Sequence, residues 1–298
     1  MLKRKALKIA RPFITPLNAY FLKKYYKNNM ELTPIESMKK ILILAPHVDD
    51  ETIGLGGTIL NAVSNGTEVH CIYITDGSKS VSGLSKEGLM AARKQEADKV
   101  QQILGIHTIK YFDQPDGQVT VNQQVVKKLA NYIEKFDPDI IFTTTFIDCH
   151  PDHVATARIL ANSLEEIDFN GEIWSYEINC PIDPSYINRV IDVTKQSEKK
   201  NTALSVFQSQ SIDFDGFVYL SQVKRALLKN HANIKSVETF LALSPATFIQ
   251  VSKRLNGEGT HFSHLFRQVN KTETLLLGVL PNRQQKHELY RKGYHFES

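Results

Sequence analysis

The sequence predicts a doubly wound α/β fold, with a mostly parallel Rossmann-like sheet and helices on both of its faces. Three observations lead to this class. Short apolar runs rich in branched residues alternate with amphipathic segments over much of the 298-residue chain. The amphipathic segments are roughly 12–18 residues long, as the crossovers between parallel strands require. Turn-forming residues such as Gly105 and Asp76-Gly77 close several of these segments.

Six apolar runs are predicted strands, because each is rich in branched or aromatic residues and is bounded by polar or turn-forming residues. They span residues 39–45, 67–75, 108–112, 139–145, 172–178 and 189–193. Helical periodicity predicts four helices among them, at residues 54–65, 86–104, 119–136 and 151–164. In such a sheet the ligand lies beyond the carboxyl ends of the strands, so we expect the site there.

The remaining segments give weaker patterns and set the expected domain boundaries. The chain after residue 194 is expected to be mostly helical to about residue 236, and the pattern weakens beyond Pro245. We predict a basic amphipathic extension at residues 1–38 and one catalytic domain at residues 39–245. Residues 246–298 are expected to form a C-terminal extension that packs on this domain.

The net charge of +4 is distributed unevenly along the chain. Residues 1–40 carry ten Lys or Arg and two Glu, whereas residues 41–245 carry 18 basic and 26 acidic side chains. Residues 246–298 carry eight basic and four acidic side chains. A nucleic-acid groove needs clustered Lys and Arg, so the acidic body argues against nucleic acid as a partner.

The sequence predicts a cytoplasmic protein. Its three cysteines, Cys71, Cys149 and Cys180, are odd in number and widely spaced, which is untypical of a disulfide framework. No apolar run reaches the length of about 18 residues that a membrane span needs. Prolines interrupt the apolar stretch near the N-terminus and no small-residue cleavage site follows, so we expect a retained segment.

Residues 1–38 alternate Lys and Arg with Leu, Ile, Phe and Tyr, which leaves two interpretations open. In the first, the segment makes peripheral contact with the anionic inner face of a membrane. In the second, one or two helices pack on the body and leave a solvated basic face. The sequence does not choose between them, and it does not give the oligomeric state.

Two clusters of His and carboxylate residues follow predicted strands. Residues 47–51 (His-Val-Asp-Asp-Glu) follow the first strand, and residues 148–153 (Asp-Cys-His-Pro-Asp-His) follow the fourth. Consecutive charges directly after a buried strand are costly unless a partner such as a metal ion neutralises them. Imidazole and carboxylate are ligands of zinc and of other divalent metals, so the two clusters together predict a metal site. Taken singly, each has an alternative as a polar turn or a helix N-terminus.

The spacing within the clusters suggests a division of roles. His47 and Asp50 lie three residues apart, so one turn brings both to a single ion, and His153 joins them from the other loop. Asp49 is then free beside the metal as a general base. His150 is left as a second acid/base or as an oxyanion donor.

Together the two clusters resemble the signature of the PIG-L/LmbE-like deacetylases, which are zinc enzymes that remove acyl groups from N-acylated sugars. The resemblance covers residues 39–245. The family's first motif is His-Pro-Asp-Asp-Glu, and here Val48 replaces the proline without touching a ligand position. The second motif, His-Pro-Asp-His at residues 150–153, matches at every position.

The resemblance implies a role for each polar residue of the two motifs. It implies that His47, Asp50 and His153 are the zinc ligands and that Asp49 is the general base. His150 is then the oxyanion-stabilising or proton-donating histidine, and Asp152 is the carboxylate that supports it. Another divalent metal is compatible with the same ligands. Whether Asp49 or His150 protonates the leaving amine is left open.

Two weaker matches concern substrate binding. Arg93-Lys-Gln-Glu96 resembles the family's Arg-x-x-Glu, in which the Arg helps to hold the substrate. The alternative interpretation of these residues is an ion pair on a helix face. Asp116-Gly117 resembles a loop that contacts sugar hydroxyls, and its alternative is a β-turn.

The sequence therefore predicts a metal-dependent N-deacetylase that acts on a small N-acetyl sugar, such as a lipid-linked or surface-glycan precursor. The alternative is a non-catalytic metal-containing module that docks a membrane or a protein through its basic ends. A dehydrogenase is disfavoured because Ile59 stands where the nucleotide fingerprint has Gly or Ala. A thiol hydrolase using Cys149 is disfavoured because neighbouring residues in a chain usually point apart, so His150 is not expected to activate it.

Overall fold

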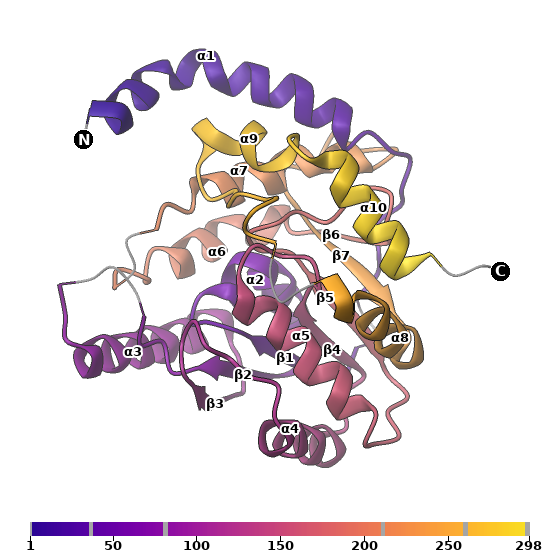
Figure 1. The fold of residues 1–298 in the computed structure, drawn as a ribbon. Coiled ribbons are helices and arrows are strands. Elements are labelled where there is room, and N and C mark those ends of the chain that lie inside the picture. Colours follow the sequence, from indigo (N-terminus) through magenta and orange to yellow (C-terminus); the bar gives the residue numbers. More distant parts are fainter. Residues whose placement is uncertain (1, 36–37, 80–82, 210–211, 259–261, 296–298) are drawn as a thin grey trace.

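The protein is described by a computed structural model, which covers residues 2–35, 38–79, 83–209, 212–258 and 262–295, with backbone only for residues 2–10. Over these residues the centre is a seven-stranded sheet in the order β3-β2-β1-β4-β5-β7-β6 (Figure 1). Strands β1 to β5 are parallel, and β7 runs antiparallel to both β5 and β6. The strands are β1 (Lys40–Ala45), β2 (Glu68–Thr75), β3 (Thr108–Gln114), β4 (Ile140–Thr144), β5 (Glu172–Tyr176), β6 (Arg189–Asp192) and β7 (Val237–Leu243).

Helices cover both faces of the sheet, which confirms the predicted doubly wound α/β class (Figure 1). Helices α2, α3 and α6 pack together on one face, and α4, α5 and α8 on the other. The helices are α1 (Leu2–Tyr25), α2 (Asp50–Ser64), α3 (Lys86–Leu104), α4 (Gln123–Phe136), α5 (Pro151–Leu164), α6 (Ser197–Leu204), α7 (Asp215–Val223), α8 (Pro245–Leu255), α9 (Leu275–Val279) and α10 (Arg283–Tyr294). Short 3₁₀ turns are η1 (Thr194–Gln196), η2 (Lys224–Leu227), η3 (Asn256–Glu258) and η4 (Thr272–Thr274).

The sheet topology determines where a ligand site lies. Strand β1 lies between β2 and β4, which are reached by crossovers on opposite faces of the sheet. Strand β4 is buried along its whole length, as expected for a parallel strand covered on both faces. Because the strand order reverses beside β1, a crevice opens at the carboxyl ends of β1 and β4.

Two glycines let α2 pack closely on its neighbours and so position the loop before it. A Cβ at Gly54 would lie 2.3 Å from Cδ2 of Tyr176, and a Cβ at Gly57 would lie 2.6 Å from Cβ of Val193. These glycines therefore allow close helix packing. The packing explains why glycines stand here, so no nucleotide-binding site is needed to explain them. The carboxylate of Glu238 also accepts a hydrogen bond from the Gly57 N–H at 2.9 Å.

The structure differs from the predicted elements in three places, the first being α2, which begins at Asp50, four residues earlier than predicted. Strand β7 was not predicted, because Glu238 and Thr239 interrupt it, so it lacks the continuous apolar run by which the other buried strands are recognised. Helix α4 begins at Gln123, four residues later than predicted. The side chain of Asn122 accepts a hydrogen bond from the Val125 N–H at 3.0 Å and so caps the helix there.

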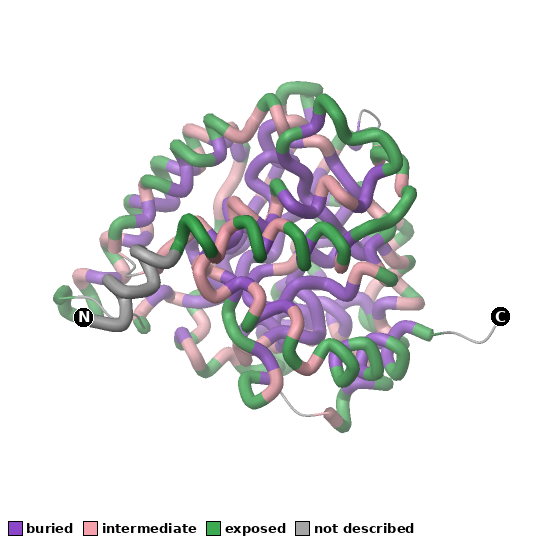
Figure 2. Tube along the Cα trace, turned by 90° about the horizontal axis from the view of Figure 1, so that it is seen from above, coloured by how far each residue is buried: buried purple, intermediate pink, exposed green. Residues whose placement is uncertain are grey.

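Helix α1 lies across the outside of the molecule, against α9 and η4 (Figure 1). Along much of its length it is exposed, in contrast to the buried sheet beneath (Figure 2). Across the described part of the chain, every helix is too short or too polar to span a lipid bilayer. Cys71, Cys149 and Cys180 are free thiols.

Candidate active site

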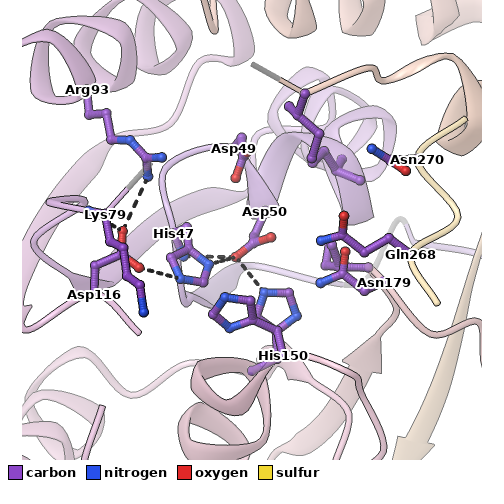
Figure 3. Close-up of a pocket in the computed structure, with 14 residues that line it drawn as sticks. His47, Asp49, Asp50, Lys79, Arg93, Asp116, His150, Asn179, Gln268 and Asn270 are labelled. Carbon is purple, nitrogen blue, oxygen red and sulfur yellow. Dashed lines mark hydrogen bonds and ion pairs between the residues drawn. The ribbon is translucent and has the colours of Figure 1, made fainter. Parts of the chain in front are cut away.

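A cavity of about 340 Å³ lies at the carboxyl ends of β1 and β4, the position that the sheet topology favours (Figure 3). Its charged wall consists of His47, Asp49, Asp50, Lys79, Arg93, Asp116, His150 and His153. Its amide wall, on the facing side, consists of Asn179, Gln268 and Asn270. Ile53, Ile178 and Ile212 complete the lining. The two predicted clusters therefore meet in one cavity.

Asp50 stands between two histidines of the charged wall. Its Oδ2 accepts a hydrogen bond from the His47 backbone N–H at 2.8 Å and lies 3.1 Å from Nδ1 of the same residue. The same oxygen lies 3.4 Å from Nε2 of His153, which the first turn of α5 carries. All three side chains are buried. One carboxylate oxygen of Asp50 thus lies within 3.4 Å of a nitrogen of each of the two imidazoles.

Asp49 adopts a strained backbone conformation, with φ 139° and ψ −26°. Such conformations cost about 1–3 kcal/mol for a residue with a side chain and concentrate at functional sites. The carbonyl of Asp49 accepts hydrogen bonds from Thr52 and Ile53, so the first turn of α2 holds the residue in place. Burial, and then the neighbouring charge of Asp50, raise the pKa of the Asp49 carboxyl well above its usual value. Asp49 is therefore a proton acceptor strengthened by its surroundings.

Asp148, two residues before the second motif, contacts residues of both walls. Its Oδ1 accepts a hydrogen bond from the His150 N–H at 2.8 Å, and its Oδ2 accepts one from the Asn179 N–H at 3.1 Å. Oδ1 also lies 3.3 Å from Nδ1 of His153. A carboxylate on the far nitrogen of a histidine fixes the ring orientation and leaves the other nitrogen available as a metal ligand.

His150 is the N-cap of α5, and this position fixes its tautomer. Its Nδ1 accepts a hydrogen bond from the Asp152 backbone N–H at 3.2 Å, so the proton of the neutral ring resides on Nε2. Burial, and then the charges of His153 and His47, lower the pKa of His150 to about 4. At neutral pH His150 is therefore an uncharged Nε2–H donor that lines the cavity.

The carboxylate of Asp152 lies against His47, whereas its backbone N–H serves His150. Its Oδ2 lies 3.2 Å from Nε2 of His47 and accepts a hydrogen bond from the Gly117 N–H at 2.6 Å. Asp116 approaches the same imidazole, with its Oδ1 3.4 Å from Nε2 of His47. Asp152 therefore joins the loop after β3 to the first motif.

Arg93 and Glu96 lie on α3 and have separate partners. Nη1 of Arg93 lies 3.9 Å from Oδ2 of Asp116. Among the described residues, neither Nε nor Nη1 of this buried guanidinium has a hydrogen-bond partner. Glu96 accepts hydrogen bonds from the N–H groups of Gln208 and Ser209 at 2.9 and 2.8 Å, and so anchors the segment after α6. The free donors of Arg93 are available to a ligand in the cavity.

The carboxylates around His47 and His153 favour the charged imidazoles. Burial lowers the pKa of both rings, but the surrounding carboxylates outweigh burial. The pKa of His47 is raised well above its usual value and that of His153 to about 10. The carboxylates concerned are Asp50, Asp116 and Asp152 around His47, and Asp50 and Asp148 around His153.

The donor set of this cluster suits a divalent metal ion. Within the described residues, the ligand atoms of His47, His150 and His153 lie within 4.8 Å of one another, and so do those of His47, Asp116 and Asp152. Imidazole and carboxylate together are typical ligands of zinc and related ions. A +2 ion would also compensate the buried carboxylates that now hold the imidazoles in their charged form.

The structure brings every sequence-predicted site residue to this cavity or to its immediate support. It also adds Asp148, Lys79 and the amide wall, to which the sequence analysis gave no role. Asp148 had a signal, since it begins the second cluster directly after a buried strand. The amide wall had none, because its residues belong to no motif and come from distant parts of the chain.

Comparisons with known proteins agree with this arrangement. Residues 42–164 match the family model described as PIG-L: GlcNAc-PI de-N-acetylase. A diacetylchitobiose deacetylase from Thermococcus kodakarensis is 28% identical over 195 residues, which cover 59% of this chain and 72% of that protein.

Two solved structures share the fold. The N,N′-diacetylchitobiose deacetylase from Pyrococcus horikoshii, complexed with an inhibitor, has a TM-score of 0.64 and 23% identity, covering 74% of this chain and 89% of that one. The 4-carboxy-2-hydroxymuconate hydratase from Pseudomonas putida has a TM-score of 0.58 and 19% identity, covering 69% and 96%.

Since a deacetylase and a hydratase have the same fold, the fold alone does not determine the reaction. The family is indicated by the motif-bearing segment, which contains both His and carboxylate clusters. Over residues 42–164, which carry both clusters, the chain is therefore similar to the PIG-L family of N-deacetylases, and the curated relative is likewise a deacetylase.

Proposed function

We propose that the protein is a zinc-dependent hydrolase that removes the acetyl group from an N-acetylated sugar, with His47, Asp50 and His153 as the metal ligands. One observation carries the proposal. Asp49, in a strained conformation and with a raised pKa, lines the same cavity as His47, Asp50 and His153 and directly precedes Asp50 in the chain. A base next to a metal site is the arrangement that hydrolysis of an amide requires.

The reaction follows from the positions of these residues. A zinc ion held by His47, Asp50 and His153 would act as a Lewis acid and would lower the pKa of a bound water molecule to about 7. Asp49 accepts the proton of the water that attacks the amide carbon. The Nε2–H of His150 donates a hydrogen bond to the negative charge that develops on the amide oxygen. The departing amine takes its proton from Asp49 or from His150, and acetate is released.

Arg93 and Asp116 are proposed to hold the sugar. The unpartnered Nε and Nη1 of Arg93 are donors for sugar oxygens, and the carboxylate of Asp116 is an acceptor for hydroxyl groups. Asp152 is proposed to act through His47, because its carboxylate fixes the orientation of that imidazole.

We also propose a class of substrate and a location for the enzyme. The basic segment at residues 1–38 favours a lipid-linked or surface-glycan precursor that is met at a membrane surface. The three free thiols suit the reducing cytoplasm, so we propose a cytoplasmic protein that contacts the inner membrane face peripherally.

Acetate release from N-acetylglucosamine and N,N′-diacetylchitobiose tests the proposal, with Asp49→Asn as the matched variant. Since Asn cannot accept the proton, we expect kcat to fall by about 100- to 10,000-fold with zinc content unchanged. Elemental analysis of both proteins provides the control for metal content. If both proteins bind zinc and neither releases acetate from any N-acetyl sugar, the non-catalytic metal-containing module becomes the better description.

A further inference from the structure

Helix α1 presents an apolar stripe to solvent, which is unusual on a surface helix. The α1 stripe consists of Phe13, Leu17, Tyr20 and Phe21, whose side chains are 78%, 54%, 65% and 44% exposed. Positions separated by four, seven and eight residues lie on the same side of a helix, so the four side chains form one continuous surface. Exposed apolar surfaces of this kind mark interaction sites.

The opposite side of α1 is fixed to the body of the protein. Leu22 and Asn18 are buried there, and the side chain of Asn18 donates a hydrogen bond to the Thr272 carbonyl at 2.6 Å. Arg11 also donates one to Asp215 at 2.8 Å. The helix therefore has a separate inner face that packs, and the α1 stripe faces outward from it.

The charge of α1 identifies what the stripe contacts. The helix contains no Asp or Glu, and Lys23, Lys24 and Lys27 are exposed at its C-terminal end beside Phe21. A second copy packed parallel to α1 on the same face would bring these cations against each other, and an antiparallel copy would leave them without an anionic partner on α1, which has no Asp or Glu. An anionic lipid surface instead attracts the lysines and accepts aromatic and aliphatic side chains between its headgroups.

We propose that α1 docks the protein on an anionic membrane surface, with the α1 stripe inserted among the headgroups and the three lysines contacting lipid phosphates. Thr272, to which α1 is bonded, lies two residues beyond Asn270 of the amide wall. Docking thus holds one wall of the cavity near the membrane, which, if the proposed function is correct, gives access to N-acetyl sugars attached to lipids.

Binding of the full-length, zinc-loaded protein to vesicles tests this proposal. We expect co-sedimentation with vesicles of equal parts phosphatidylcholine and phosphatidylglycerol, and little with phosphatidylcholine alone. Replacing the whole stripe with serine (F13S/L17S/Y20S/F21S) is expected to reduce binding by about tenfold or more. Leu32→Ser with Val121→Ser, which removes exposed apolar side chains elsewhere, is the matched control and is expected to bind like wild type.

A second pair of measurements separates the lysines from the stripe. Lys23→Gln with Lys24→Gln should weaken binding about tenfold, and added salt should weaken binding of the wild type but affect this variant less. Circular dichroism melting verifies that each variant is folded. Equal binding to neutral and anionic vesicles, or none to either, contradicts the proposal.

Sedimentation velocity gives a further decisive outcome. If the wild type is a dimer and the serine variant a monomer, the stripe contacts a second copy of the chain and the membrane proposal is wrong. The deacetylase proposal is tested independently, because the serine variant should still release acetate from a water-soluble N-acetyl sugar at the wild-type rate. Vesicle binding by a protein that is inactive on every sugar would refute only the proposed function.

Discussion

The two walls of the cavity originate differently in the chain. The charged wall comes from the ends of the parallel strands and the helices that follow them, within residues 47–153. The amide wall comes from Asn179 after β5 and from Gln268 and Asn270 near the C-terminus. The charged wall therefore depends on short strand–loop–helix units, whereas the amide wall depends on how distant segments pack against one another.

The two walls are also held in place differently. Residues of the charged wall position one another, as Asp50 does for His47 and His153. The amide wall is held by contacts with α7, because the Gly216 N–H donates a hydrogen bond to the Asn270 carbonyl at 3.0 Å. A Cβ at Gly216 would lie 2.2 Å from the Val269 carbonyl oxygen, so α7 and this segment fit without space between them. We therefore expect chemistry to depend on the first wall and substrate selection on the second.

The largest expected effect distinguishes two ligand sets within the charged wall. The imidazole nitrogens of His47, His150 and His153 lie close enough to bind one ion, but Asp50 contacts two of these histidines. We predict that Asp50→Asn weakens zinc binding by at least about 100-fold, because a ligand is lost. His150→Ala should leave zinc affinity within a few-fold and lower kcat by about 100-fold.

Competition with a chelating dye measures the zinc affinity of both variants, and acetate release measures kcat. The reverse result, with zinc lost in His150→Ala and retained in Asp50→Asn, would assign the ion to the three histidines. The general base would then have to be sought again, because the position of Asp49 relative to the ion would change.

Asp148 gives the next largest effect, because it contacts both walls through His153 and Asn179. We predict that Asp148→Asn lowers zinc affinity by about 10- to 100-fold, as removal of a carboxylate behind a metal-binding histidine does. Asp139→Asn is the matched control, since Asp139 accepts hydrogen bonds from the backbone of Lys39 and Lys40 at the other end of the sheet. A similar loss of affinity in the control would mean that the effect comes from general instability.

The two walls also differ in how far they could be predicted from the sequence. The parallel sheet, its first strands and the two motifs were predictable, because buried parallel strands and their loops depend on residues close together in the chain. The contacts of Asp152 were not, because its carboxylate could reach either His150 or His47, and only the packing of the loop after β3 decides. The amide wall and β7 depend on long-range packing, for which no local pattern exists.

Zinc binding by the charged wall is expected to depend on pH. The pKa of His153 is raised to about 10 and that of His47 is also raised, so both imidazoles are protonated at neutral pH in the metal-free protein. Zinc must displace these protons, so its affinity should increase with pH by about tenfold per unit for each proton released. Calorimetry in buffers of different ionisation enthalpy counts the protons. Binding without proton release would show that the imidazoles are already neutral.

The smallest expected effect tests the amide wall. Gln268→Ala and Asn270→Ala each remove side-chain hydrogen-bonding groups from the lining of the cavity and leave the charged wall intact. A hydrogen bond contributes about 0.5–1.5 kcal/mol, so we predict a rise in KM of about three- to tenfold, with kcat within a few-fold of wild type. Asn162→Ala on α5, which faces a different groove, is the control. The rise in KM should be larger for N,N′-diacetylchitobiose than for N-acetylglucosamine, because the longer substrate extends beyond the charged wall. Equal effects on both sugars, or a fall in kcat alone, would mean that the amide wall serves the reacting group and that the division between the walls is wrong.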